Sequence, residues 1–328
     1  AEVVGPEATP ATHEPLLELL RAHVEQEVVL ERGLAVIEVG AGAGLFDEQF
    51  EDAGHASDGA QASTRLAARP GSGLTTPAQR GTRERMIAKQ ARAVVTGAAG
   101  GLGRAFALEL AGRGARLLLS DVDESGLEET ARLAKSAGAQ RVETMRCDVA
   151  NALEVDQLRE RAEAELGGCD LLINNAGVAV AGPIGEVPLA DWEWIMGINL
   201  WGPIHGCHSF VPLMKRQGTG HILNVASIAG IAQAPQMAPY NVTKSGVISL
   251  SETLSGELAE FGIGVTVLCP YFFKTNIHNA SRAHGKVEKS QAMVGKLMEK
   301  TSVQAADVAR LALQACDRGE LYALPHNE

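Results

Sequence analysis

The sequence predicts an α/β fold in which a doubly wound, parallel seven-stranded sheet carries helices on both faces. From Ala91 onward, short apolar runs alternate with helical patterns, which is the order expected of repeated strand–helix–strand units. The seven runs start near Arg92, Arg116, Arg141, Asp170, His221, Gly264 and Leu321. A glycine-rich turn between the first run and the first helical pattern agrees with this fold class.

This turn follows the apolar run that ends at Thr96 and contains Gly97, Gly101, Leu102 and Gly103. Gly97 allows a tight turn, Gly101 lets the backbone approach a pyrophosphate, and Gly103 allows close packing of the helix. The N–H groups at the start of that helix are then free to face phosphates. The pattern therefore predicts a Rossmann-type dinucleotide-binding sheet.

Asp121 ends the second apolar run, Arg116 to Ser120, and lies 18 residues beyond Gly103 (121 minus 103). A carboxylate at this place accepts hydrogen bonds from the adenosine ribose and repels a 2′-phosphate. This favours NAD over NADP as the cofactor. The alternative is an aspartate that only caps the next helix.

Further polar and small residues follow later runs, at the carboxyl ends of strands, where open α/β sheets bind ligands. We expect these to complete the cofactor site: Asp148, Val149, Asn175, Ala176, Gly177, Pro270 and Thr275.

Tyr240 and Lys244 stand four positions apart in a stretch that predicts a helix, so both side chains point to one side. A free tyrosine has a pKa of ~10, and a neighbouring cation favours the phenolate and lowers that pKa. The pair could pass a proton to an alcohol oxygen. Taken alone, the pair is also typical of a solvated helix face. In the same way, Asn199 taken alone is compatible with a buried residue that hydrogen-bonds within a helix, and Ser227 with a helix cap.

In these motifs the chain resembles the short-chain dehydrogenase/reductase family from about Ala91 to Pro325. The turn T-G-x-x-x-G-x-G lies at Thr96 to Gly103, N-N-A-G at Asn174 to Gly177, and the tetrad at Asn199, Ser227, Tyr240 and Lys244. The step of thirteen residues from Ser227 to Tyr240 is the usual one for the family.

The resemblance implies NAD(P)-dependent hydride transfer with a secondary alcohol or ketone. It also implies that Tyr240 is the general acid/base, that Ser227 holds the substrate oxygen, and that Lys244 binds the nicotinamide ribose and lowers the tyrosine pKa. Asn199 would position a water that links Lys244 to solvent. A homodimer or homotetramer is expected as well.

The chain departs from the family where Tyr271 follows Pro270 in place of a glycine, so we expect the loop on the nicotinamide side to take another path. The aromatic run of Tyr271, Phe272 and Phe273 either lines the edge of the pocket or packs in the core. With Met237, it indicates an apolar substrate. Residues from Asn276 to Thr301 stand where the family has its substrate lid, with an amphipathic surface helix as the alternative. Gly100 also fits the T-G-x-x-G-x-x-G turn of longer, epimerase-like members, which the N-N-A-G motif argues against.

Composition excludes several other classes. A net charge of −11, with 29 basic and 40 acidic residues and no basic stripe, does not suit nucleic-acid binding. Five cysteines in predicted core elements indicate reduced thiols, and His205-Gly206-Cys207-His208 lacks the second ligand cluster of a zinc site, so no metal is predicted. No apolar run reaches the ~18 residues of a membrane span. We expect a soluble, cytoplasmic protein.

Residues 1–50 are predicted to be an extension, 51–85 a flexible linker rich in Gly, Ala and Ser, and 86–328 the catalytic domain, with Met86 as its start. Ala35 to Gly44 resembles the first motif of S-adenosylmethionine-dependent methyltransferases, although the other strands of that sheet are missing. Two alternatives to the dehydrogenase remain: a noncatalytic nucleotide-binding scaffold or sensor on the same fold, and a bifunctional chain that also binds S-adenosylmethionine.

Overall fold

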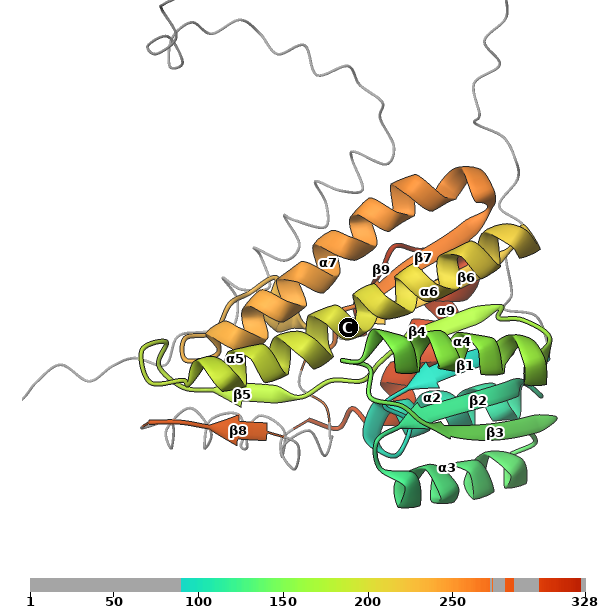
Figure 1. The fold of residues 1–328 in the computed structure, drawn as a ribbon, viewed down its shortest axis with the longest axis horizontal. Helices are drawn as coiled ribbons and strands as arrows, with labels where there is room; N and C mark the ends of the chain where they lie inside the picture. Colours follow the sequence, from blue (N-terminus) through green and yellow to red (C-terminus); the bar gives the residue numbers. More distant parts are fainter. Residues whose placement is uncertain (1–89, 272, 274–280, 286–300, 326–328) are drawn as a thin grey trace, which may run out of the picture. The chain divides into compact units, whose positions relative to one another are not determined.

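The computed structural model describes residues 90–271, 273, 281–285 and 301–325. The predictions for residues 1–50 and 51–85, for the methyltransferase-like turn, for Met86 and for Thr275 lie outside these residues. Within them, seven parallel strands form one sheet in the order β3-β2-β1-β4-β6-β7-β9. Helices flank the sheet (Figure 1). The predicted fold class is confirmed.

The elements follow one another as predicted. The strands of the main sheet are β1 (Arg92–Thr96), β2 (Arg116–Asp121), β3 (Arg141–Arg146), β4 (Leu171–Asn174), β6 (Gly220–Val225), β7 (Ile263–Leu268) and β9 (Tyr322–Ala323). The α-helices are α2 (Gly101–Gly112), α3 (Glu124–Ser136), α4 (Ala152–Leu166), α5 (Leu189–Met196), α6 (Gly202–Gln217), α7 (Ala238–Leu258) and α9 (Ala305–Arg318). Short helical turns are η1 (Gly197–Trp201), η2 (Ile228–Gly230) and η3 (Ala259–Phe261).

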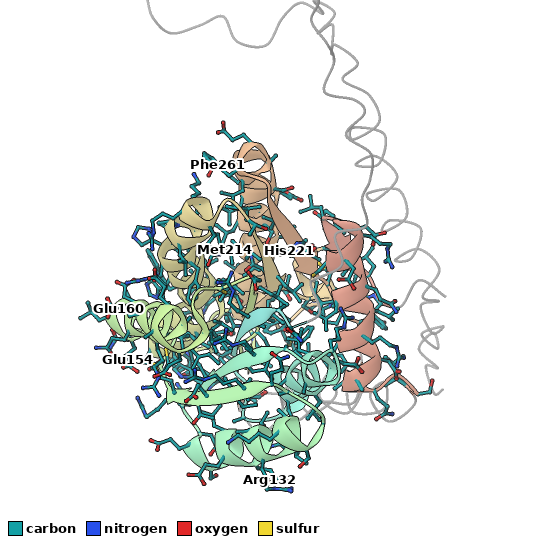
Figure 2. All side chains as sticks on the ribbon, turned by 90° about the vertical axis from the view of Figure 1, so that its right-hand side faces the viewer. Arg132, Glu154, Glu160, Met214, His221 and Phe261 are labelled. Carbon is teal, nitrogen blue, oxygen red and sulfur yellow. The ribbon has the colours of Figure 1, made fainter. Side chains whose placement is uncertain are left out.

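The sheet is buried on both faces, because successive strand residues point to opposite sides. Leu117 and Leu119 of β2 pack with α2, α3 and α9, whereas Leu118 between them packs with α4 and α6. Figure 2 shows the two helical layers, with Glu154 and Glu160 of α4 on one side and the red α9 on the other. Nearly continuous apolar strands are typical of such doubly covered parallel sheets.

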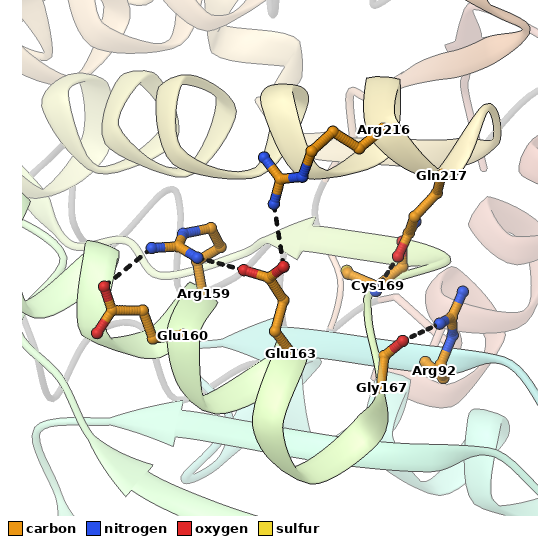
Figure 3. A network of polar contacts seen from close by, with 8 residues as sticks. All are labelled: Arg92, Arg159, Glu160, Glu163, Gly167, Cys169, Arg216 and Gln217. Atoms are coloured by element: carbon orange, nitrogen blue, oxygen red, sulfur yellow. Dashed lines mark hydrogen bonds and ion pairs between the residues drawn. The ribbon is translucent and has the colours of Figure 1, made fainter.

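A polar network fastens the amino-terminal edge of the sheet, the edge opposite to the strand ends that carry the predicted site (Figure 3). Arg92, at the start of β1, donates to the Gly167 carbonyl after α4 and pairs with Asp170 before β4. The Gln217 amide bonds both backbone groups of Cys169, at 3.0 and 2.8 Å. Arg216 of α6 pairs with Glu163 of α4 at 3.0 Å. These contacts connect β1, β4, α4 and α6 at the amino-terminal edge of the sheet.

All five cysteines are free and buried, as predicted for reduced thiols. Burial raises the pKa of Cys147 to about 11 and the pKa values of Cys207 and Cys316 to about 12. A thiol reacts as its thiolate, so these cysteines are unreactive at neutral pH. Among the helices that the structure describes, none is long and apolar enough to span a bilayer.

A second, two-stranded parallel sheet was not predicted. It pairs β5 (Ala179–Ala181), just after the N-N-A-G motif, with β8 (Ser281–Ala283). Of the segment for which a lid or a surface helix was predicted, only residues 281–285 and 301 are described. Those predictions for residues 276–280 and 286–300 lie outside the described residues.

Candidate active site

The glycine turn after β1 is closed on the side of the sheet. Gly97 has φ +65°, and a Cβ built on it would lie 2.7 Å from Ala176 Cα. A Cβ on Gly103 would lie 2.1 Å from the Gly97 carbonyl oxygen. No side chain fits at either position, so the turn brings β4 and the start of α2 into contact. Gly100, the N-cap of α2, provides no side-chain cap, and the first turn of α2 has no acidic residue.

This geometry fits the diphosphate of a dinucleotide. The first N–H groups of a helix lack partners within the helix, and they carry the positive end of its dipole. They attract phosphates when no acidic side chain competes. Gly101 and Leu102 open α2 and therefore lie where the sequence predicts phosphate contacts.

Thr96 and Asn175 fasten the glycine turn to the end of β4. The Thr96 hydroxyl accepts from the N–H groups of Asn175 and Ala176 at 3.0 and 3.1 Å. The Asn175 amide donates back to the carbonyls of Thr96 and Gly97 at 2.9 and 3.1 Å. The Asn175 side chain thus makes hydrogen bonds within the protein. Ala176 and Gly177 follow it in the chain, at the carboxyl ends of β1 and β4.

Asp121 lies across the glycine turn, at the end of β2. One carboxylate oxygen accepts from the Ala99 N–H at 2.9 Å, and the other accepts from the Val122 N–H at 2.7 Å. The alternative of a helix cap is wrong for Asp121, because Asp123 is the N-cap of α3 and accepts from the Gly126 N–H. Arg104 is directed inward, where its Nε donates to the Thr130 hydroxyl at 2.9 Å.

Asp148 and Val149 follow β3 and stand next to the end of β2, since the Cys147 N–H donates to the Asp121 carbonyl at 3.0 Å. Asp148 accepts from the Ala150 N–H at 3.0 Å. Val149 is 7% exposed, and its carbonyl bonds His205 Nδ1 at 2.9 Å. Both residues therefore border the adenosine side of the predicted cofactor site.

Asn199 lies in η1, a single π-helical turn, and is fully buried. Its Oδ1 accepts from the Val178 N–H, and its Nδ2 donates to the Val178 carbonyl, both at 2.8 Å. The same Nδ2 also donates to the Thr243 hydroxyl of α7 at 3.3 Å. Isolated π turns often mark functional sites, and this one aims the amide at the chain that leaves β4.

Lys244 and Tyr240 stand side by side on α7. Lys244 Nζ donates to the Val225 carbonyl at the end of β6 at 2.9 Å, and it lies 5.7 Å from the centroid of the Tyr240 ring. A Cβ built on Gly177 would be 3.5 Å from both Lys244 Nζ and Asn199 Oδ1. The glycine thus leaves room beside the amine.

Ser227 completes the group. It follows β6, accepts from the Ala229 N–H at 3.2 Å, and its hydroxyl is hydrogen-bonded to Tyr240. The structure therefore brings all four predicted catalytic residues together, although they come from η1, the end of β6 and α7.

Burial dominates the electrostatics of this group. It lowers the pKa of Lys244 to about 8, an effect that nearby Cys269 partly opposes. It raises the pKa of Tyr240, which the hydrogen bond from Ser227 partly offsets. The expected lowering of the tyrosine pKa by Lys244 is thus not found, because loss of hydration destabilises the phenolate.

The loop after β7 differs from one of the predictions. The Pro270 carbonyl accepts from the Ile228 N–H at 3.0 Å and so supports the turn behind Ser227. Tyr271 is partly exposed and has no positive φ. Phe273 is 8% exposed and packs in the core with Leu268 and Val308. For Phe273, the prediction of core packing is therefore correct and the prediction that it lines the edge of the pocket is wrong. Phe272 lies outside the described residues.

His205 and Cys207 have structural contacts. His205 stacks on Trp201 with ring centroids 5.6 Å apart, and Cys207 lies beside Asn174 and Asn224 in the core. In the part of the chain that the structure describes, no three His, Cys, Asp or Glu side chains come close enough together to hold a metal ion.

A sequence model of the family described as short chain dehydrogenase matches residues 91–286, which is 196 of 328 residues (286 − 91 + 1). The chain belongs to the short-chain dehydrogenase family. Membership supports an oxidoreductase activity of the short-chain dehydrogenase type and a nicotinamide cofactor.

A relative from Lactiplantibacillus plantarum, the CLA biosynthesis dehydrogenase/reductase, is 39% identical over 188 residues. This match covers 56% of the present chain and 65% of the relative, just under two thirds of its length. A family member from Burkholderia phymatum, solved in complex with NAD, is 36% identical with a TM-score of 0.69. The match covers 74% of this chain and 90% of the chain from Burkholderia phymatum. The structure of levodione reductase is 25% identical with a TM-score of 0.65, over 72% and 95% of the two chains.

Two residues with clear roles at the site were missed from the sequence. Thr96 was part of the turn motif, but its hydroxyl was not expected to bind the N-N-A-G segment. Val178 bonds Asn199 through its backbone alone, so its side chain gave no signal. The β strand that ends at Thr96, followed at once by glycine, could have drawn attention to the hydroxyl.

Proposed function

We propose that this protein is a dehydrogenase or reductase that interconverts a secondary alcohol and a ketone, prefers NAD, and uses Tyr240 as general acid/base. The observation that carries the proposal is the hydrogen bond between Ser227 and Tyr240 beside the buried ammonium of Lys244. A hydroxyl and a phenol at one point can hold one substrate oxygen.

The residues of the chain divide the work of one proton transfer. When bound, the cofactor accepts or donates the hydride and, in its oxidised form, adds a positive charge. Ser227 donates to the substrate oxygen and stabilises the charge that grows there. Tyr240 takes the proton of the alcohol during oxidation and returns it to the carbonyl oxygen during reduction.

Lys244 supports this transfer as a cation. With a pKa of about 8 it is largely protonated at neutral pH, and it favours the phenolate of Tyr240. Its ammonium carries three donors, of which one is used by the Val225 carbonyl. The other two serve the cofactor ribose and a water held near Asn199.

The preference for NAD follows from Asp121. Its carboxylate stays beside the start of α2, where the ribose of the adenosine half would lie, and it repels a 2′-phosphate. Arg104, a cation of the same turn, is directed toward Thr130 and the Ala99 carbonyl instead. The cofactor residues proposed here are those of the glycine turn, of the ends of β2, β3 and β4, and Pro270 and Thr275.

An apolar substrate is supported by the surroundings of Tyr240. Its ring packs against a cluster formed by Val178, Val180, Val187 and Ile195, with Trp192 and Trp194 at the border. The name levodione reductase refers to a dione, so that structural relative acts on a ketone by name. Both points favour a ketone with hydrocarbon on each side of the carbonyl.

The assembly, the location and the domain division are part of the same proposal: a cytoplasmic homodimer or homotetramer whose catalytic domain is 86–328, preceded by an extension at 1–50 and a linker at 51–85. Two exposed apolar side chains support self-association, since Trp201 is 52% exposed and Val242 of α7 is 49% exposed. Exposed large apolar side chains can take part in contacts between copies.

A panel of secondary alcohols and ketones, followed by the absorbance of reduced cofactor, tests this function. We expect turnover of apolar members of the panel, with NAD(H) preferred. Ser227→Ala should lose at least about 100-fold in kcat, whereas the control Thr253→Ala, on the exposed face of α7, should match the wild type. Cofactor binding without turnover of any panel member would favour the noncatalytic nucleotide-binding protein instead.

A further inference from the structure

Asp191 is a carboxylate in an unusual place. It lies in the first turn of α5, is 8% exposed, and is one of the few buried acidic residues of the described chain. Aspartate is rarely buried unless it is paired. Here each oxygen has a partner: Oδ1 pairs with Arg282 of β8, and Oδ2 pairs with His284 just beyond it.

The contact between α5 and β8 is reinforced by a second residue of α5. The Arg282 guanidinium lies 3.7 Å from the centroid of the Trp194 ring, in a cation–π contact. Trp194 and Asp191 are three positions apart and so share one side of the helix. One arginine is therefore held by two side chains of α5, and its hydrogen bond keeps the pKa of Asp191 low.

In the described part of the chain, β8 pairs with β5 in a two-stranded sheet. β5 and β8 are three residues each and form an isolated parallel pair, with Val180 opposite Arg282 (Figure 1). The His284 N–H adds one bond to the Ala181 carbonyl at 2.9 Å. Two-stranded sheets are marginal in water without further packing. The contacts of Asp191 with Arg282 and His284 add a link between β8 and α5.

β5 in turn adjoins the catalytic group at both ends. It starts directly after Val178, whose backbone is bonded by Asn199. Val180 is fully buried in the apolar cluster that borders Tyr240. Beyond β5, the Gly182 N–H donates to the Gln236 carbonyl at 2.7 Å, just before α7 begins.

Gln236 has φ +64°, which is unusual for a residue other than glycine. A strained residue is kept only where its surroundings hold it, and the bond from Gly182 is one such restraint. A change in β5 is thus transmitted to the entrance of the helix that carries Tyr240.

We propose that Asp191 is a positioning residue for substrate binding, which acts by fastening β8 to α5 and thereby keeps β5 and the apolar cluster around Tyr240 in place. The adenosine part of the cofactor site, at the ends of β1, β2 and β3, lies on other elements than this contact. The kinetic part of the proposal rests on the proposed function, whereas the structural part does not.

Hydrogen exchange and kinetics on Asp191→Asn test it together. The variant keeps the shape of the side chain and removes its charge. We expect amides of β5 and β8 to exchange at least about tenfold faster, KM for the ketone to rise about tenfold with kcat within about threefold, and the Kd of NADH to stay unchanged. The control Glu129→Gln removes an exposed ion pair with Arg132 on α3 and should change none of these values.

Arg282→Gln gives an independent arm, since the Arg282 side chain is 46% exposed and its loss leaves the core intact. It should raise the amide exchange rates of β5 and β8 and the KM for the ketone, as Asp191→Asn does. In the double variant neither value should rise beyond that of the more strongly affected single variant. Unchanged exchange in both variants would overturn the proposal. Faster exchange with an unchanged KM would also overturn it, because the contact would then serve β8 alone.

A wild-type protein without turnover would contradict the proposed function, and the exchange data would still decide whether Asp191 fastens β8.

Discussion

Thr96 and Asn175 are hydrogen-bonded to each other at the carboxyl ends of β1 and β4. The Thr96 hydroxyl accepts from the Asn175 N–H at 3.0 Å, and the Asn175 amide returns a bond to the Thr96 carbonyl at 2.9 Å. The glycine turn and the N-N-A-G segment, 79 residues apart in the chain, are thereby one structural unit. The protein's own hydrogen bonds therefore support the shape of the cofactor turn.

Thr96→Val should damage this unit although it keeps the volume of the side chain. The change leaves the N–H groups of Asn175 and Ala176 without their acceptor, which costs about 1–3 kcal/mol for a buried group. We expect a lower Tm and an increase of about tenfold in the Kd of NADH. Thr144→Val on β3, an exposed position, is the matched control and should keep both values. Equal cofactor binding in the two variants would show that the hydrogen bonds of the Thr96 hydroxyl do not shape the turn.

Asp121→Asn should weaken the discrimination between NADH and NADPH. The amide oxygen can still accept from the Ala99 N–H, so the turn keeps its bond while the charge that repels a 2′-phosphate is removed. We expect the ratio of the two Kd values to fall at least about tenfold. Asp123→Asn removes the same charge two residues away, and asparagine still caps α3. A similar loss of discrimination in both variants would assign the effect to overall charge.

Lys244→Met should change how stability depends on pH. Lys244 is 4% exposed, and its folded-state pKa of about 8 lies below the ordinary 10.5. Burial of the charge therefore destabilises the fold fully below pH 8, and the penalty disappears as the pH rises from there to above 10.5. This corresponds to about 3 kcal/mol.

The variant should consequently gain stability relative to the wild type at pH 7 and lose most of that gain by pH 10. Bonds lost with the Val225 carbonyl are the same at both pH values and cancel in the comparison. Denaturant unfolding at the two pH values measures it. Lys135→Met on the exposed face of α3 should give no such trend. A stability difference between Lys244→Met and the wild type that does not change with pH would mean that the pKa of Lys244 is not lowered in the folded state.

Much of the fold could be predicted because its strands are buried on both faces. Continuous apolar runs such as Leu117 to Leu119 stand out against the helical patterns around them, and all seven predicted starts fall within one residue of the observed strands. β5 and β8 were missed because three residues are too few to show a period. The contact of β8 with α5 is made by Asp191 and Arg282, which are 91 residues apart.

The candidate site was predictable to the extent that short motifs set it. The spacing of Tyr240 and Lys244 places both on one side of α7, and the structure brings Ser227 and Asn199 to them. The direction of the tyrosine pKa was wrong, because the expectation counted the charge of Lys244 and not the burial of the phenol. Asp191 gave no signal, since an acidic residue in the first turn of a helix is common on surfaces.

The central claim is that Tyr240 moves the proton of the substrate, and single-turnover oxidation of NADH by a ketone substrate tests it most directly. Tyr240→Phe should bind NADH with the wild-type Kd and transfer hydride at least about 100-fold more slowly. Tyr322→Phe on β9, which removes a hydroxyl bonded to Glu252 away from the candidate site, should keep the wild-type rate. Transfer in Tyr240→Phe within about threefold of the wild-type rate would contradict the account.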